Sequence, residues 1–125
     1  MYALEIKPTK SSPAIWFDPD RGVLGIYGES YPENSFEFYA PLFAWLREAL
    51  PSLPALRVEV SVSYMNSSSA KCMLDLLDAL EAAHAEGKRV ELDWFYDREN
   101  PRSLDLAEEF REDCHFPFRT AVSGG

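Results

Sequence analysis

Apolar and polar residues alternate most regularly over residues 56–64, with a period of two. The apolar positions are Leu56, Val58, Val60, Val62 and Tyr64, and the polar positions between them are Arg57, Glu59, Ser61 and Ser63. This period is typical of a β-strand with one buried face. We therefore predict a central strand here, with all five apolar side chains facing the core.

Two other segments repeat apolar residues every three or four positions, which predicts amphipathic helices. The first begins at an N-cap of Asn34 or Ser35 and runs to about residue 50, with a predicted buried stripe of Phe36, Tyr39, Phe43 and Leu46. Because proline removes a backbone donor, we expect a kink or a restart at Pro41. The second helix ends at Gly87 as its C-cap, and its predicted stripe is Ala70, Met73, Leu74, Leu77 and Leu80.

The remaining segments complete an alternation of strands and helices. Residues 14–18 and 23–27 flank a cluster of turn formers, which predicts a hairpin, and a short strand over residues 3–7 is expected before it. Further along, the pattern predicts a strand over 88–96, a helix from Pro101 or Ser103 to about residue 114, and a last strand over 116–122. Strands that alternate with helices pair in parallel. We predict one α/β domain over residues 1–125, with a mixed sheet in which an N-terminal hairpin precedes the helix–strand alternation.

Composition narrows the classes of function. The 125 residues carry 12 Lys and Arg against 21 Asp and Glu, a formal charge of −9, and the basic residues are scattered. Nucleic acids and anionic membranes are held by clustered cations, so neither is an expected partner. No apolar run approaches a membrane span and the first residues do not resemble a signal peptide, so we interpret the chain as cytoplasmic.

The most informative segment joins the predicted central strand to the second helix. Tyr64-Met-Asn-Ser-Ser-Ser-Ala-Lys71 places an amide and three hydroxyls where a helix begins. Helix N-termini expose unpaired N–H groups and a partial positive charge, and they stabilise anions such as a phosphoryl group. The alternative is that Ser67, Ser68 or Ser69 only caps the helix.

This segment resembles the phosphoacceptor loop of the SiaC-type regulatory phosphoproteins, which are bacterial biofilm regulators. Gly28-Glu-Ser-Tyr-Pro-Glu-Asn-Ser-Phe-Glu37 is also similar to a stretch of that family, as are residues 11–15, 74–81, 94–100 and 106–118. The resemblance implies a fold similar to STAS domains. It also implies that the protein is a switch, not an enzyme, and needs no cofactor. In its unphosphorylated form such a protein binds and activates a diguanylate cyclase in c-di-GMP signalling. A Ser/Thr protein kinase and a PP2C-type phosphatase are the other implied partners.

The resemblance assigns roles to particular residues. The family's phosphorylated Thr falls on Ser67, with Ser68 and Ser69 as less favoured sites of modification. Asn66 is expected to position the loop, and Ser68 and Lys71 to contact a partner, although Lys71 is equally well explained as a solvated surface residue. Glu29, Tyr31, Glu33 and Asn34, in an expected loop, are predicted to line the same face or to form only a turn and a helix cap.

Two other functions stay open. A STAS-type antagonist of an anti-sigma factor has the same fold but a different partner. A small serine-dependent enzyme needs a base and an orienting acid beside its nucleophile, and neither His84 nor His115 lies in such a motif. No metal site is expected from the spacing of Cys and His residues. Trp16, Trp45 and Trp94 are expected in the core.

Overall fold

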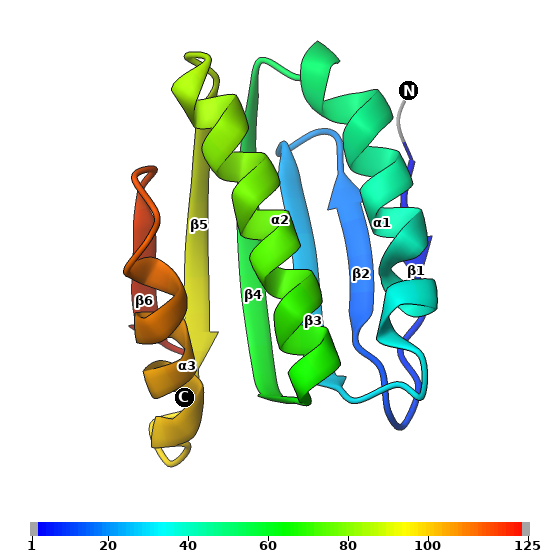
Figure 1. Cartoon of the computed structure of the whole chain (residues 1–125), viewed down its shortest axis with the longest axis vertical. Helices are drawn as coiled ribbons and strands as arrows, with labels where there is room; N and C mark the ends of the chain where they lie inside the picture. Colours follow the sequence, from blue (N-terminus) through cyan, green and yellow to red (C-terminus); the bar gives the residue numbers. More distant parts are fainter. Residues whose placement is uncertain (1–2, 124–125) are drawn as a thin grey trace.

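Six strands form one sheet in the order β1-β2-β3-β4-β5-β6, which is also their order along the chain (Figure 1). This computed structural model describes residues 3–123. The strands are β1 (Glu5–Ile6), β2 (Ala14–Asp18), β3 (Val23–Ser30), β4 (Ala55–Met65), β5 (Arg89–Tyr96) and β6 (Phe118–Val122). The predicted hairpin, central strand and two later strands are all present.

The pairing is mixed, as predicted. β1, β2 and β3 pair antiparallel, and β3 to β6 pair in parallel. Gly22 ends the hairpin turn with a φ of +67°, a conformation that costs glycine little. The parallel pairs bring the carboxyl ends of β3, β4 and β5 to one edge, at the bottom of Figure 1.

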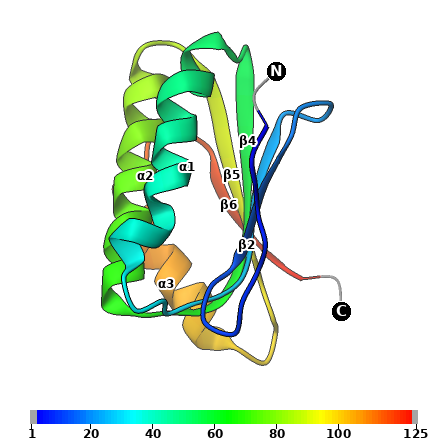
Figure 2. The ribbon, with the colours of Figure 1, turned by 90° about the vertical axis from the view of Figure 1, so that its right-hand side faces the viewer.

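All the helices cover the same face of the sheet, as Figure 2 shows. They are α1 (Ser35–Ala49), which continues into the 3-10 turn η1 (Leu50–Ser52), α2 (Ser67–Ala85) and α3 (Pro101–Arg111). The core lies between these two layers, and Trp94 at its centre is fully buried. The Trp94 indole donates to Ser103 Oγ, which in turn donates to the Val62 carbonyl, and these bonds fix α3 against β4 and β5.

The helices differ from the predicted pattern at three positions. α1 runs through Pro41 without a restart, because Pro41 lies on the exposed side, where water can bond the carbonyl that proline leaves unpaired. Phe36 is 58% exposed and Leu74 is 44% exposed, although both were expected in buried stripes. The buried face of α1 is instead Ser35, Tyr39, Leu42, Trp45, Leu46 and Ala49.

The opposite face of the sheet has no helix over it in the described part of the chain (Figure 2). Trp45 and Trp94 are buried as predicted, but Trp16 lies on this open face, only partly buried beside Tyr27. Further along the face, Arg119 bonds both Glu91 and Asp93. Arg57 pairs with the same two carboxylates, so these charges compensate one another.

Candidate functional site

The candidate site lies where α1 and α2 begin, at the carboxyl edge of β3 and β4 (Figure 1). The Asn66 N–H donates to the Ser30 carbonyl over 2.9 Å, which joins the ends of the two strands. In parallel sheets this edge is the usual place for binding sites, because loops and helix N-termini converge there.

A β-bulge sets the orientation of the segment that follows β4. Gly28 pairs with Val62 but Glu29 pairs with Tyr64, so Ser63 is an extra residue in β4. The extra residue reverses the alternation: Met65 enters the core and Tyr64 is 54% exposed. The prediction that Tyr64 shares the buried face of Val62 was therefore wrong, since no periodic pattern signals a bulge.

Asn66 is the N-cap of α2. Its backbone is extended, and its side-chain oxygen accepts from the Ser69 N–H over 2.9 Å. This bond satisfies one of the helix's unpaired donors. The alternative that one of the three serines caps the helix was wrong, because Asn66 fills that position.

Five hydroxyls and the Asn66 amide form a continuous network, which we call the hydroxyl network. Its contacts are Tyr39–Ser30 at 2.6 Å, Ser30–Ser69 at 2.7 Å, Ser69–Ser35 at 3.1 Å, Ser35–Ser68 at 2.7 Å and Ser68–Asn66 at 3.3 Å. Ser30, Ser35 and Ser69 are at most 1% exposed. The network thus joins β3, α1 and α2 through side chains inside the protein.

The protons of the hydroxyl network point in one direction. Ser30 donates to Ser69, and Ser68 donates to the Asn66 oxygen. Each hydroxyl has one proton, so Tyr39 donates to Ser30, Ser69 to Ser35, and Ser35 to Ser68. Burial raises the pKa of Tyr39, so its hydroxyl keeps this proton at neutral pH.

Ser67 differs from its two neighbours because its side chain is exposed. Within residues 3–123 its hydroxyl makes no hydrogen bond, whereas those of Ser68 and Ser69 are both engaged. It is the first residue of α2, where the helix dipole favours negative charge.

Lys71 lies one turn further along α2 and is also exposed. Its ammonium lies 3.0 Å from Asp75 Oδ1, and this hydrogen bond raises the pKa of Lys71. A phosphoryl group near Lys71 would have to compete with that carboxylate.

The segment of residues 29–34 is part strand and part loop. Glu29 and Ser30 belong to β3, so the prediction of a loop from Glu29 was wrong. Asn34 caps α1 by accepting from the Glu37 N–H at 3.1 Å, while Glu33 is exposed. Tyr31 is 41% exposed, and its ring packs edge-on against that of Tyr64, with the ring centroids 5.9 Å apart.

Sequence reasoning missed five residues at this edge. Tyr64 and Phe36 add exposed aromatic surface on the segments that meet at the start of α2, and Ser30, Ser35 and Tyr39 build the hydroxyl network. One signal was available for Ser30, since it continues the every-second-residue spacing of the buried Leu24 and Ile26.

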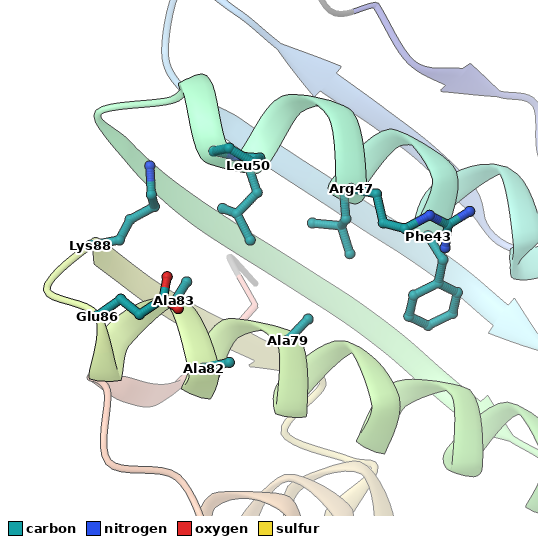
Figure 3. A pocket seen from close by; sticks show the side chains of 10 residues that line it. Phe43, Arg47, Leu50, Ala79, Ala82, Ala83, Glu86 and Lys88 are labelled. Atoms are coloured by element: carbon teal, nitrogen blue, oxygen red, sulfur yellow. The ribbon is translucent and has the colours of Figure 1, made fainter.

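A separate apolar groove of about 380 Å³ lies between the C-terminal halves of α1 and α2 (Figure 3). Phe43 lines it from α1, Leu50 from η1, and Ala79 and Ala83 from α2. This groove is at the opposite end of α2 from Ser67, so it is no part of the candidate site. Across residues 3–123, no cluster of His, Cys, Asp and Glu suits a metal ion, and no helix is long and apolar enough to span a membrane.

Comparison with known proteins decides the family. Residues 6–123 match the model of the SiaC family of regulatory phosphoproteins. The chain belongs to the SiaC family. A relative from Pseudomonas aeruginosa (strain UCBPP-PA14) is 47% identical over 119 residues, which are 94% of each chain. This membership confirms the resemblance to the SiaC-type regulatory phosphoproteins.

Solved SiaC structures share the fold. Apo-SiaC from P. aeruginosa, 45% identical, superposes with a TM-score of 0.91 over 98% of this chain and all of that one. Another solved structure is a complex of the diguanylate cyclase SiaD with its activator SiaC, also from P. aeruginosa. The matching chain of that structure is 45% identical to this one. It gives a TM-score of 0.88 over 94% of this chain and 99% of its own.

Proposed function

We propose that this SiaC family member is a phosphorylation-controlled binding switch: unphosphorylated, it binds and activates a diguanylate cyclase. A Ser/Thr protein kinase phosphorylates Ser67 and a PP2C-type phosphatase reverses the modification. The observation that carries the proposal is that Ser67 alone of the three consecutive serines is exposed and free of side-chain hydrogen bonds in the described structure. The named activator–cyclase pair from P. aeruginosa supports the choice of partner.

The surroundings of Ser67 suit protein binding. Exposed aromatic rings of Tyr31, Phe36 and Tyr64 lie on the segments that meet at the start of α2. Aromatic side chains contribute much of the energy of protein interfaces. We propose that these rings, with Ser67, Ser68, Lys71 and the exposed residues of 29–34, form the cyclase-binding face.

Phosphorylation changes the charge of this face. A phosphoserine carries about −1.5 to −2 charges at neutral pH. At the first position of α2 the helix dipole stabilises that charge, so the modified protein keeps its fold. A carboxylate of the cyclase that faces Ser67, in contrast, would be repelled by the phosphate and would lose its hydration, so cyclase binding would weaken.

The test begins with protein purified from its own host. Intact-mass and phosphosite mass spectrometry, before and after a PP2C-type phosphatase, should find one phosphate on Ser67. The two forms are then compared for binding to the host's diguanylate cyclase and for stimulation of c-di-GMP synthesis. We expect at least about tenfold weaker binding by the phosphorylated form, or about 1.4 kcal/mol.

Variants separate charge from other effects. Ser67→Ala should lose the phosphate and keep cyclase binding, and Ser67→Asp should bind more weakly. Ala85→Asp adds the same charge at the exposed opposite end of α2 and should bind normally. Equal binding by the two phosphorylation states would refute the charge switch.

The STAS-type antagonist and the small serine-dependent enzyme, the two alternative functions, would give different outcomes with the same purified protein. Capture of an anti-sigma factor in place of a cyclase would identify a STAS-type antagonist. Turnover of a substrate without any partner would identify an enzyme. Against the enzyme, no histidine of residues 3–123 hydrogen-bonds Ser67, Ser68 or Ser69, and His115 is instead paired with Glu81.

A further inference from the structure

Three consecutive serines at the start of α2 present three different hydroxyls. Ser67 is exposed, Ser68 is partly buried and Ser69 is fully buried. A kinase must surround the hydroxyl that it modifies, so burial alone excludes Ser69. Burial does not exclude Ser68, which is next to the proposed site of modification.

A residue of another helix holds the Ser68 hydroxyl. Ser35, the first residue of α1, places its Oγ 2.7 Å from Ser68 Oγ and is itself 1% exposed. Because the protons of the hydroxyl network point from Tyr39 to Asn66, Ser35 donates to Ser68, and Ser68 donates to Asn66 Oδ1. The Ser68 oxygen thus has its proton and one lone pair engaged: the bond from Ser35 holds it toward α1, and the bond to Asn66 holds it toward the cap of α2.

We propose that Ser35 is a specificity-determining residue that confines phosphorylation to Ser67 by holding the Ser68 hydroxyl against α1. The inference rests on the proposed function and deepens it. In the transfer, the serine Oγ forms a bond to the γ-phosphorus of ATP as the bond from that phosphorus to the β–γ bridging oxygen breaks. The hydroxyl proton passes to a base of the kinase, and ADP leaves with the electron pair. For Ser68 this attack requires that the oxygen turn outward and give up both of its bonds.

Loss of the Ser35 hydroxyl should release Ser68 specifically. In Ser35→Ala the Ser68 oxygen keeps only its bond to Asn66, at 3.3 Å and near the surface, so the side chain can turn outward. Ser69 stays unavailable, because it remains fully buried and retains its 2.7 Å bond from Ser30.

The experiment compares four proteins with MgATP and the host kinase fraction that phosphorylates the wild type. They are the wild type, Ser67→Ala, Ser35→Ala/Ser67→Ala and, as matched control, Ser30→Ala/Ser67→Ala. The control breaks the hydroxyl network at Ser69 but leaves the Ser35–Ser68 bond in place. Circular dichroism and thermal unfolding establish that each variant is folded at the assay temperature, and Ser35→Cys/Ser67→Ala replaces the alanine variant if that one is not.

We expect a phosphate on Ser67 of the wild type and none on Ser67→Ala. Ser35→Ala/Ser67→Ala should gain phosphate on Ser68, at an initial rate at least about tenfold above the background signal of Ser67→Ala, which is the size of effect expected from one hydrogen bond. The Ser30 control should stay at the Ser67→Ala rate.

Three results would overturn the inference while the proposed function stands, because the wild type would still carry phosphate on Ser67. They are no gain in the Ser35 double variant, an equal gain in the Ser30 control, and phosphate on Ser68 with Ser35 intact. A wild type without phosphate on Ser67 would overturn the proposed function, and the inference with it.

Discussion

The direction of proton donation in the hydroxyl network predicts that the stability costs of Ser30→Ala and Tyr39→Phe are not additive. Tyr39 donates to Ser30, and both residues are buried, at 4% and 0% exposure. Ser30→Ala leaves the Tyr39 proton without an acceptor, which costs about 1–3 kcal/mol. Tyr39→Phe removes the donor and leaves Ser30 its bond to Ser69, so it should cost only about 0.5–1.5 kcal/mol.

The double variant should therefore be more stable than Ser30→Ala alone. Removing both partners of a buried hydrogen bond leaves no unpaired donor. Tyr39→Phe thus destabilises the wild type but stabilises the Ser30→Ala background. Each 1 kcal/mol corresponds to about 3–5 °C in Tm for a domain of this size.

Urea unfolding at pH 7, followed by circular dichroism, measures all four proteins of this cycle. Additive costs would show that Tyr39 and Ser30 do not interact. A cost of Tyr39→Phe larger than that of Ser30→Ala would show that the protons run the other way, since Ser30 would then be the residue left without an acceptor. Either result would refute the reasoning.

Two further predictions concern stability. Asn66→Ala removes the cap of α2 and should lower the free energy of unfolding, measured with urea, by about 1 kcal/mol. Asn66→Asp keeps a capping oxygen and should stay near the wild type. An equal loss of unfolding free energy in both variants would contradict the role of the cap. The hydrogen bond from Arg119 holds the pKa of Glu91 below its ordinary value of 4.5. The depressed pKa adds stability that is present above pH 4.5 and is lost as the pH falls through the folded value. Glu91→Gln should therefore flatten the loss of unfolding free energy between pH 5 and pH 3, while Glu99→Gln, in an exposed loop, should not.

Local signals in the sequence predicted most of the fold. The turn at Gly22, the cap at Asn34 and the end of α2 before Gly87 each depend on one residue's conformation or hydrogen bond. The predicted mixed sheet and hairpin are confirmed by the structure and by its likeness to SiaC. These features could be predicted because their causes lie within a few residues of each other.

The failures have longer-range causes. The stripe predicted for α1 included Phe36, but the helix is rotated so that Ser35 is buried, and that burial is favourable only because Ser68 and Ser69 of α2 bond to it. Tyr64 was misplaced for a similar reason, since the bulge depends on how β4 pairs with β3. The family motif pointed to Ser67, but the difference between its hydroxyl and that of Ser68 is visible only in three dimensions.

The bulge at Ser63 also bears on how this segment tolerates changes in length. Side chains of a strand alternate between faces, so deleting one residue there would restore the simple alternation and turn the following residues to the other side. Asn66 could then no longer reach both the Ser30 carbonyl and the first turn of α2. An insertion or deletion in residues 63–66 is therefore a more drastic mutation than any single replacement there. The number of residues in this short segment, as much as their identity, decides which serine faces the solvent.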